Sequence, residues 1–159
     1  MENLTNHTFE EITLGQTAEY RKQVTERDIV LFAELSGDIN PLHLDAEFAA
    51  GTEFGERIAH GMLTGALISA ALALRLPGPG TVYLGQSLRF RRPVKVGDEI
   101  TVQLEVTEKR EDKGFVTLEC KALNQQGKVV VTGTAEVLAP REKLSLPPPV
   151  LPDVSVAGG

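Results

Sequence analysis

The sequence predicts an α+β fold in which a long antiparallel sheet packs against one buried helix. Residues 61–74 are apolar nearly all round, which is typical of a helix that is covered on every side. From residue 81 onward, apolar and polar residues alternate along several segments that are joined by short turns. We therefore expect consecutive strands that pair with one another as antiparallel neighbours.

The length and composition predict one domain with an appended tail. The 159 residues are enough for one hydrophobic core. We expect this domain over residues 1–139 and a flexible, proline-rich C-terminal tail over residues 140–159. The single cysteine, Cys120, allows no intramolecular disulfide, and the amino terminus has no signal-peptide pattern, so we expect a cytoplasmic protein. Cys120 alternates with apolar neighbours and is expected in the core.

The net charge and motif inventory exclude several function classes. A formal net charge of −6 disfavours a nucleic acid or an anionic membrane as partner. The longest apolar run, residues 61–74, is too short to cross a bilayer. The histidines and Cys120 lack the spacing of a metal site, so we predict none. Phosphate-loop and dinucleotide-binding fingerprints are also missing.

The amino-terminal half predicts one strand and two helices before the buried helix. Residues 17–24 are expected to form the strand. A helix is expected over residues 26–35, because Thr25 and Asp28 resemble a capping box and Ser36-Gly37 is a stop signal. A short helix capped by Asp45 is expected to run to Ala50, and residues 51–59 to form a loop.

Two candidate chemical sites flank that loop. In "SGDINPLHLD" (36–45), Asp38 and His43 lie close together on a segment that Pro41 keeps partly extended, so they can share one water as an acid–base pair. A simple turn held by Asx hydrogen bonds is the alternative. At His60-Gly61 the buried helix begins, and its free N–H groups can stabilise a developing oxyanion. The alternative there is a cap and a close packing contact.

The chain resembles the (R)-specific enoyl-CoA hydratase family, the MaoC-like dehydratases. The resemblance rests on "LSGDINPLHLDAEFA", on "RIAHGMLTGALISAAL" and on "YLGQSLRFRRPVKVGDEI", and it covers roughly residues 10–139. It implies the hot-dog fold, a central helix wrapped by an antiparallel sheet, and a homodimer. It also implies hydration of a trans-2-enoyl-CoA to the (R)-3-hydroxyacyl-CoA, without a cofactor, since coenzyme A is part of the acyl-CoA thioester substrate.

The resemblance also implies roles for individual residues. Asp38 and His43 would activate the water, and the Gly61 N–H would bind the thioester carbonyl. Further residues would contact or support the substrate: Asn40, His60, Ser69, Leu72, Arg89 and Val137. Ser69 is equally a small helix-packing residue, and Arg89 with its cationic neighbours is equally a solvated edge.

Other functions on the same fold remain to be separated. A thioesterase would need a carboxylate on the central helix, and residues 60–74 contain none. A (3R)-hydroxyacyl-ACP dehydratase of fatty-acid synthesis is one alternative, because the sequence does not distinguish coenzyme A from acyl carrier protein. A non-catalytic acyl-CoA-binding subunit would lack Asp38 or His43. Polyester precursor supply, β-oxidation and fatty-acid synthesis all fit the predicted chemistry.

Overall fold

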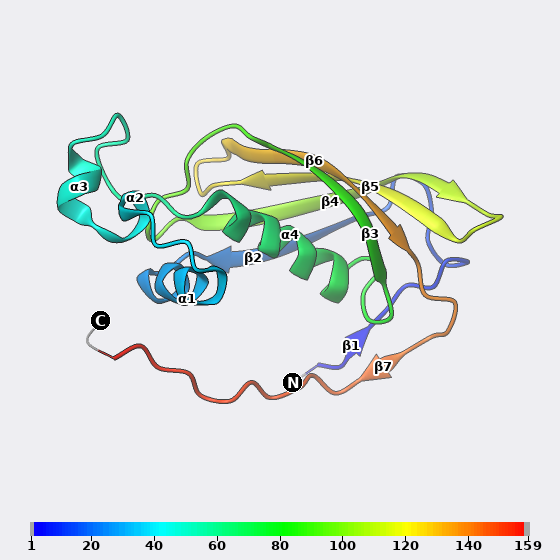
Figure 1. Cartoon of the computed structure of the whole chain (residues 1–159). Coiled ribbons are helices and arrows are strands. Elements are labelled where there is room, and N and C mark those ends of the chain that lie inside the picture. The colour runs from blue at the N-terminus through cyan, green and yellow to red at the C-terminus, as the bar shows by residue number, and fades with distance from the viewer. Residues whose placement is uncertain (1, 158–159) are drawn as a thin grey trace.

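The computed structural model describes residues 2–157, and its centre is helix α4 (Gly61–Leu74) lying across one face of a five-stranded antiparallel sheet (Figure 1). The strands are β2 (Thr17–Gln23), β3 (Val82–Phe90), β4 (Glu99–Arg110), β5 (Phe115–Leu123) and β6 (Val129–Leu138). The sheet bends around the helix, and this is the hot-dog arrangement that the sequence predicted.

The strand order corrects one expectation. The order is β2-β4-β5-β6-β3, so β4, β5 and β6 pair with their sequence neighbours as predicted. The prediction that β3 pairs with β4 is wrong, because β3 pairs with β6 and β4 pairs with β2. At Gly133 of β6, an added Cβ would lie 2.0 Å from the backbone oxygen of Ser87 in β3, so this crossing requires glycine. Strand β3 is consequently an edge of the sheet.

Three shorter helices lie between β2 and α4. Helix α1 (Glu26–Ser36) begins with the predicted capping box of Thr25 and Asp28 and ends at Gly37, whose φ is 81°. Helix α3 (Ala46–Ala50) is capped by Asp45 and is followed by Gly51, as expected. Helix α2 (Pro41–Leu44) was not expected, and Pro41 occupies its first turn, where a missing N–H costs nothing.

The core lies between α4 and the concave face of the sheet. It contains the buried side of α4 and alternate residues of β4, β5 and β6. Cys120 of β5 is fully buried there, and this burial raises the pKa of its thiol to about 11. None of the helices in residues 2–157 is long and apolar enough to span a membrane.

A segment near the amino terminus pairs with one near the carboxyl terminus beside the main sheet. Strand β1 (Leu4–Thr5) pairs with β7 (Ser145–Leu146) in a small second sheet. Beyond β7 the chain runs in an extended path back toward α1, where Arg27 donates two hydrogen bonds to the carbonyl oxygen of Val154 (Figure 1). The predicted tail is therefore held at two places, and its flexibility stays a prediction.

Candidate active site

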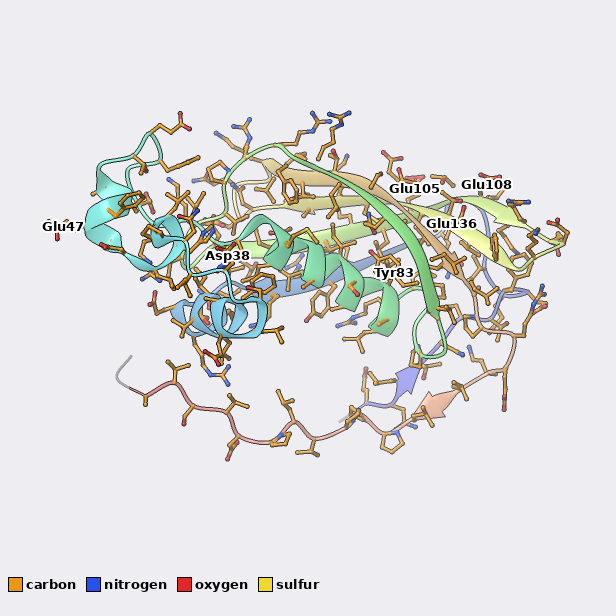
Figure 2. The ribbon with its side chains drawn as sticks, in the orientation of Figure 1. Asp38, Glu47, Tyr83, Glu105, Glu108 and Glu136 are labelled. Carbon is orange, nitrogen blue, oxygen red and sulfur yellow. The ribbon has the colours of Figure 1, made fainter. Side chains whose placement is uncertain are left out.

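Asp38 lies on the turn between α1 and α2, at the end of the molecule where α4 begins (Figure 2). Its Oδ1 accepts a hydrogen bond from the backbone N–H of Asn40 at 3.1 Å. The side-chain oxygen of Asn40 in turn accepts from the N–H of Leu42 at 3.0 Å and caps α2. The Asx turn that the sequence offered as an alternative is thus present, and it leaves Oδ2 of Asp38 free to face His43.

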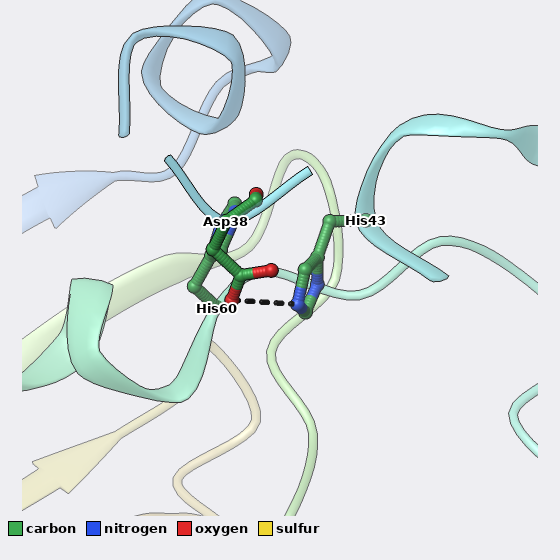
Figure 3. A group of neighbouring side chains, drawn as sticks. All are labelled: Asp38, His43 and His60. Atoms are coloured by element: carbon green, nitrogen blue, oxygen red, sulfur yellow. Dashed lines mark hydrogen bonds and ion pairs between the residues drawn. The ribbon is translucent and has the colours of Figure 1, made fainter. Parts of the chain in front are cut away.

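His43 lies on α2, not on irregular backbone as the sequence suggested, and its ring is buried. Its Nδ1 lies 2.8 Å from the carbonyl oxygen of Ile58. Because a carbonyl can only accept, Nδ1 carries the proton and Nε2 of the neutral ring has a free lone pair. That Nε2 lies 3.7 Å from Oδ2 of Asp38 (Figure 3). This separation exceeds a direct hydrogen bond, so both atoms can bind the same water.

His60 contacts both Asp38 and His43. Its ring stacks on the ring of His43, with centroids 3.9 Å apart and planes 28° apart. Its Nε2 donates to the backbone carbonyl of Asp38 at 3.0 Å. His60 therefore supports Asp38 and His43, and its contact with substrate stays a prediction.

Arg57, which the sequence reasoning missed, fixes α2 from the other side. Its Nε donates to the carbonyl oxygen of His43 at 2.6 Å, and its Nη1 forms an ion pair with Glu26 of α1, also at 2.6 Å. Its position in the loop before "AHG" gave no periodic signal that could have identified it. The contact ties the backbone of His43 to the first helix.

Gly61 opens α4 at the mouth of a cavity of about 330 Å³, which we call the histidine cavity. His43, His60, Gly61 and Thr64 line one side of it, and residues 90–94 line another. His60 precedes the helix without capping it by its side chain, and the N–H of Gly61 donates to no described residue. This N–H is therefore free for a ligand, at the positive end of the helix dipole.

A second, larger hollow lies between α4 and the edge strand β3. This β3 groove has a volume of about 690 Å³ and is lined by Phe32, Met62, Gly65, Ala66, Ser69 and residues of β3 from Tyr83 to Phe90. Its lining is mostly apolar. Phe90 borders both the groove and the histidine cavity, so the two hollows adjoin.

The remaining predicted residues lie apart from Asp38 and His43. Ser69 lines the β3 groove and makes no hydrogen bond with Asp38. Leu72 and Val137 are fully buried in the core and line neither hollow. Arg89 is exposed on β3, while Arg91 and Arg92 line the histidine cavity.

Asp38, His43 and His60 could in principle bind a metal ion, because each has one possible ligand atom within 4.8 Å of those of the other two. A metal bound by two imidazoles must lie near both ring planes, along the nitrogen lone pairs. The two rings are stacked with their planes only 28° apart, so their lone pairs do not converge on one point. The arrangement suits a shared water better than a metal ion.

Comparison with known proteins identifies the family of the chain. Residues 9–131 match the family model described as "MaoC like domain". An (R)-specific enoyl-CoA hydratase from Rhodospirillum rubrum is 47% identical over 139 residues, which cover 87% of this chain and 96% of that protein. A second one, from Aeromonas caviae, is 49% identical, with coverage of 81% and 96%. The unliganded R-hydratase PhaJ1 structure from Pseudomonas aeruginosa superposes with a TM-score of 0.94 at 56% identity, covering 98% and 99% of the two chains. The chain belongs to the MaoC-like dehydratase family.

Proposed function

We propose that the protein is an (R)-specific enoyl-CoA hydratase that adds water to a trans-2-enoyl-CoA and catalyses the reverse dehydration. The observation that carries the proposal is the pair formed by Oδ2 of Asp38 and Nε2 of His43, 3.7 Å apart beside the free N–H of Gly61. The relatives named above carry the same activity in their names.

The first step is activation of water by the pair. Both facing atoms have lone pairs, so one water donates a hydrogen bond to each of them. As the water oxygen bonds to the β-carbon, the pair removes one of its protons. The pair then delivers a proton to the α-carbon on the same face, and the net change is addition of H and OH across the double bond. A positioned acid or base typically contributes about 10²–10⁴-fold to the rate.

The second element is stabilisation of the enolate-like charge. When oxygen adds to the β-carbon, negative charge moves to the thioester oxygen. Gly61 lines the histidine cavity at the start of α4, and a fixed N–H donor there favours that charge without reorganisation.

We place the acyl chain in the β3 groove. The groove is apolar and adjoins the histidine cavity at Phe90. Ser69 lies in this groove, which agrees with a substrate-contacting role. Leu72 and Val137 then act from the layer behind the groove, by supporting its shape. The coenzyme A phosphates are assigned to the cationic end of β3, where Arg89, Arg91 and Arg92 are exposed.

We also propose that the active form is a homodimer joined through β3. This strand is an edge of the sheet, and Val82, Tyr83 and Leu84 are 49%, 40% and 45% exposed. An unprotected edge with large apolar side chains favours pairing with another strand, and two copies of β3 can pair antiparallel about a two-fold axis. Such a dimer would close the β3 groove.

The setting of the reaction follows from the same proposal. We infer a cytoplasmic enzyme that needs no cofactor, with supply of (R)-3-hydroxyacyl precursors for polyester synthesis as one use. The buried, unreactive thiol of Cys120 is compatible with a reducing compartment.

The direct test is hydration of crotonyl-CoA by the purified protein, followed by loss of the enoyl absorbance. Chiral analysis should find the (R)-3-hydroxy product. The assay should be repeated with longer enoyl-CoA esters and with the matching acyl carrier protein thioesters. No turnover with any CoA ester, or an (S) product, would refute the proposal, and turnover of the carrier-protein thioesters alone would favour the ACP dehydratase.

A further inference from the structure

Thr64 carries a buried hydroxyl that the fold does not use. It lies in the first turns of α4, is 1% exposed, and its Oγ1 has no hydrogen-bond partner among the described residues. A buried hydroxyl without a partner costs free energy, typically about 1–3 kcal/mol. Valine has the same shape without that cost, so a threonine here indicates a use for the oxygen.

The place of Thr64 suggests this use. It follows Gly61 by three residues, and residues three apart lie on the same face of a helix. Both residues line the histidine cavity, together with His43 and His60. The Thr64 side chain therefore borders the same cavity as Gly61.

His60 does not supply a second donor in this cavity. Its Nε2 carries a proton toward the carbonyl oxygen of Asp38, so Nδ1 of the neutral ring is an acceptor. Nδ1 is itself buried without a partner. Of the side chains of His43, His60 and Thr64, the Thr64 hydroxyl is the one that can donate to an incoming carbonyl, because Nδ1 of His43 already donates to Ile58.

We propose that the Thr64 hydroxyl is a second oxyanion donor, which hydrogen-bonds the thioester oxygen alongside the N–H of Gly61. The inference rests on the proposed hydratase function and assigns one more catalytic residue to it. The Thr64 hydrogen bond strengthens as charge develops on the thioester oxygen, so its loss affects kcat more than KM. No proton is transferred from Thr64, because the enolate is protonated at the α-carbon.

Two substitutions separate the hydroxyl from the methyl group. Thr64→Val keeps the shape and removes the hydroxyl, whereas Thr64→Ser keeps the hydroxyl and removes the methyl. With crotonyl-CoA we expect Thr64→Val to lower kcat by about 10²-fold, as for loss of one oxyanion-hole donor, with little change in KM. Thr64→Ser should retain most of the wild-type kcat. Circular dichroism and thermal melting should verify that both variants fold.

The outcomes are distinct. If Thr64→Val retains the wild-type kcat, or if Thr64→Ser loses as much as Thr64→Val, the side chain acts through packing and the inference is wrong. An inactive wild-type protein would instead refute the hydratase proposal, before any variant is compared. If Thr64→Val fails to fold, Thr64→Ala and Thr64→Ser are compared at equal stability, and equal kcat values overturn the inference.

Discussion

The ring of His60 stacks on the ring of His43, with their centroids 3.9 Å apart, while Nε2 of His60 holds the backbone of Asp38. One side chain thus contacts both members of the proposed catalytic pair. The ring of Phe32 in α1 packs against the ring of His60, with their centroids 4.9 Å apart. His60, at the N-cap of α4, therefore supports both members of the pair and is itself packed against α1, although Asp38 remains half exposed.

The first prediction concerns the catalytic pair. Asp38→Asn and His43→Gln should each lower kcat for crotonyl-CoA by about 10²–10⁴-fold, because each removes a group that can take up or deliver a proton. Asp45→Asn is the matched control, since Asp45 lies on the same segment but only caps α3. Rates near wild type for both pair variants would show that the water is activated elsewhere.

A second prediction concerns access to the start of α4. A Cβ added at Gly61 would lie 2.9 Å from Cε1 of Phe90, closer than atoms normally approach. Gly61→Ala should therefore displace the Phe90 ring and obstruct the approach of the thioester, and misplacement of about 1 Å can cost about 10²-fold in rate. The measurement is kcat/KM.

The double variant Gly61→Ala with Phe90→Leu separates the two effects. Leucine relieves the contact with the new methyl group, but the methyl remains beside the N–H. We expect the double variant to stay impaired, while Phe90→Leu alone is more active. Full recovery in the double variant would mean that only the position of Phe90 matters.

A third prediction concerns the edge of the sheet, where Figure 2 shows Tyr83 on β3. Leu84→Lys should convert the proposed dimer to a monomer, because a charged side chain on an exposed edge opposes strand pairing. Light scattering coupled to size exclusion measures the mass. Leu14→Lys is the control, as Leu14 is 66% exposed outside β3. A monomeric wild type would contradict the proposed homodimer.

A fourth prediction concerns the pH dependence of stability at the start of α1. Partial burial by itself would raise the pKa of Asp28, but hydrogen bonds from Thr25 and Lys22 outweigh it and hold the pKa below the ordinary value. The ionised carboxylate therefore stabilises the fold above the unfolded-state pKa of about 3.9. This contribution disappears as the pH falls through the lower folded-state pKa.

The measurement compares thermal unfolding of wild type and Asp28→Asn from pH 7 to pH 3. We expect the variant to be less stable at pH 7, by about 0.3–1 kcal/mol for a charge at a helix start, and the gap to close below about pH 4. Glu53→Gln, in an exposed loop, is the control. A gap that persists unchanged at pH 3 would contradict the role of the charge.

Local sequence signals predicted most of the fold and the proximity of Asp38 and His43. The capping box at Thr25, the cap at Asp45 and the apolar run from Gly61 each depend on neighbouring residues, so the sequence contains them directly. The pairing of β3 with β6 depends on long-range packing around α4, which alternation along each strand does not encode. The prediction of neighbouring pairs failed there for this reason.

The site shows the same division between local and long-range information. The Gly-Asp-x-Asn-Pro-x-His motif placed Asp38 and His43 together, because the residues between them form a turn and a short helix. The contacts of Arg57 with His43 and Glu26 link segments far apart in the chain and had no local signature. Thr64 had a signal, since it and Ser69 are the two polar side chains of a largely apolar helix, but the sequence reasoning used only Ser69.

The small sheet of β1 and β7 joins residues that are far apart along the chain, since Thr5 and Ser145 are separated by 140 positions. Bringing such distant segments together costs chain entropy. Two short strands make too few contacts to offset this cost until the rest of the domain has folded. During synthesis, Leu4 and Thr5 can pair with β7 only after almost the whole domain has left the ribosome. Hydrogen exchange should accordingly be fastest at this closure, and it should form last when the denatured chain refolds.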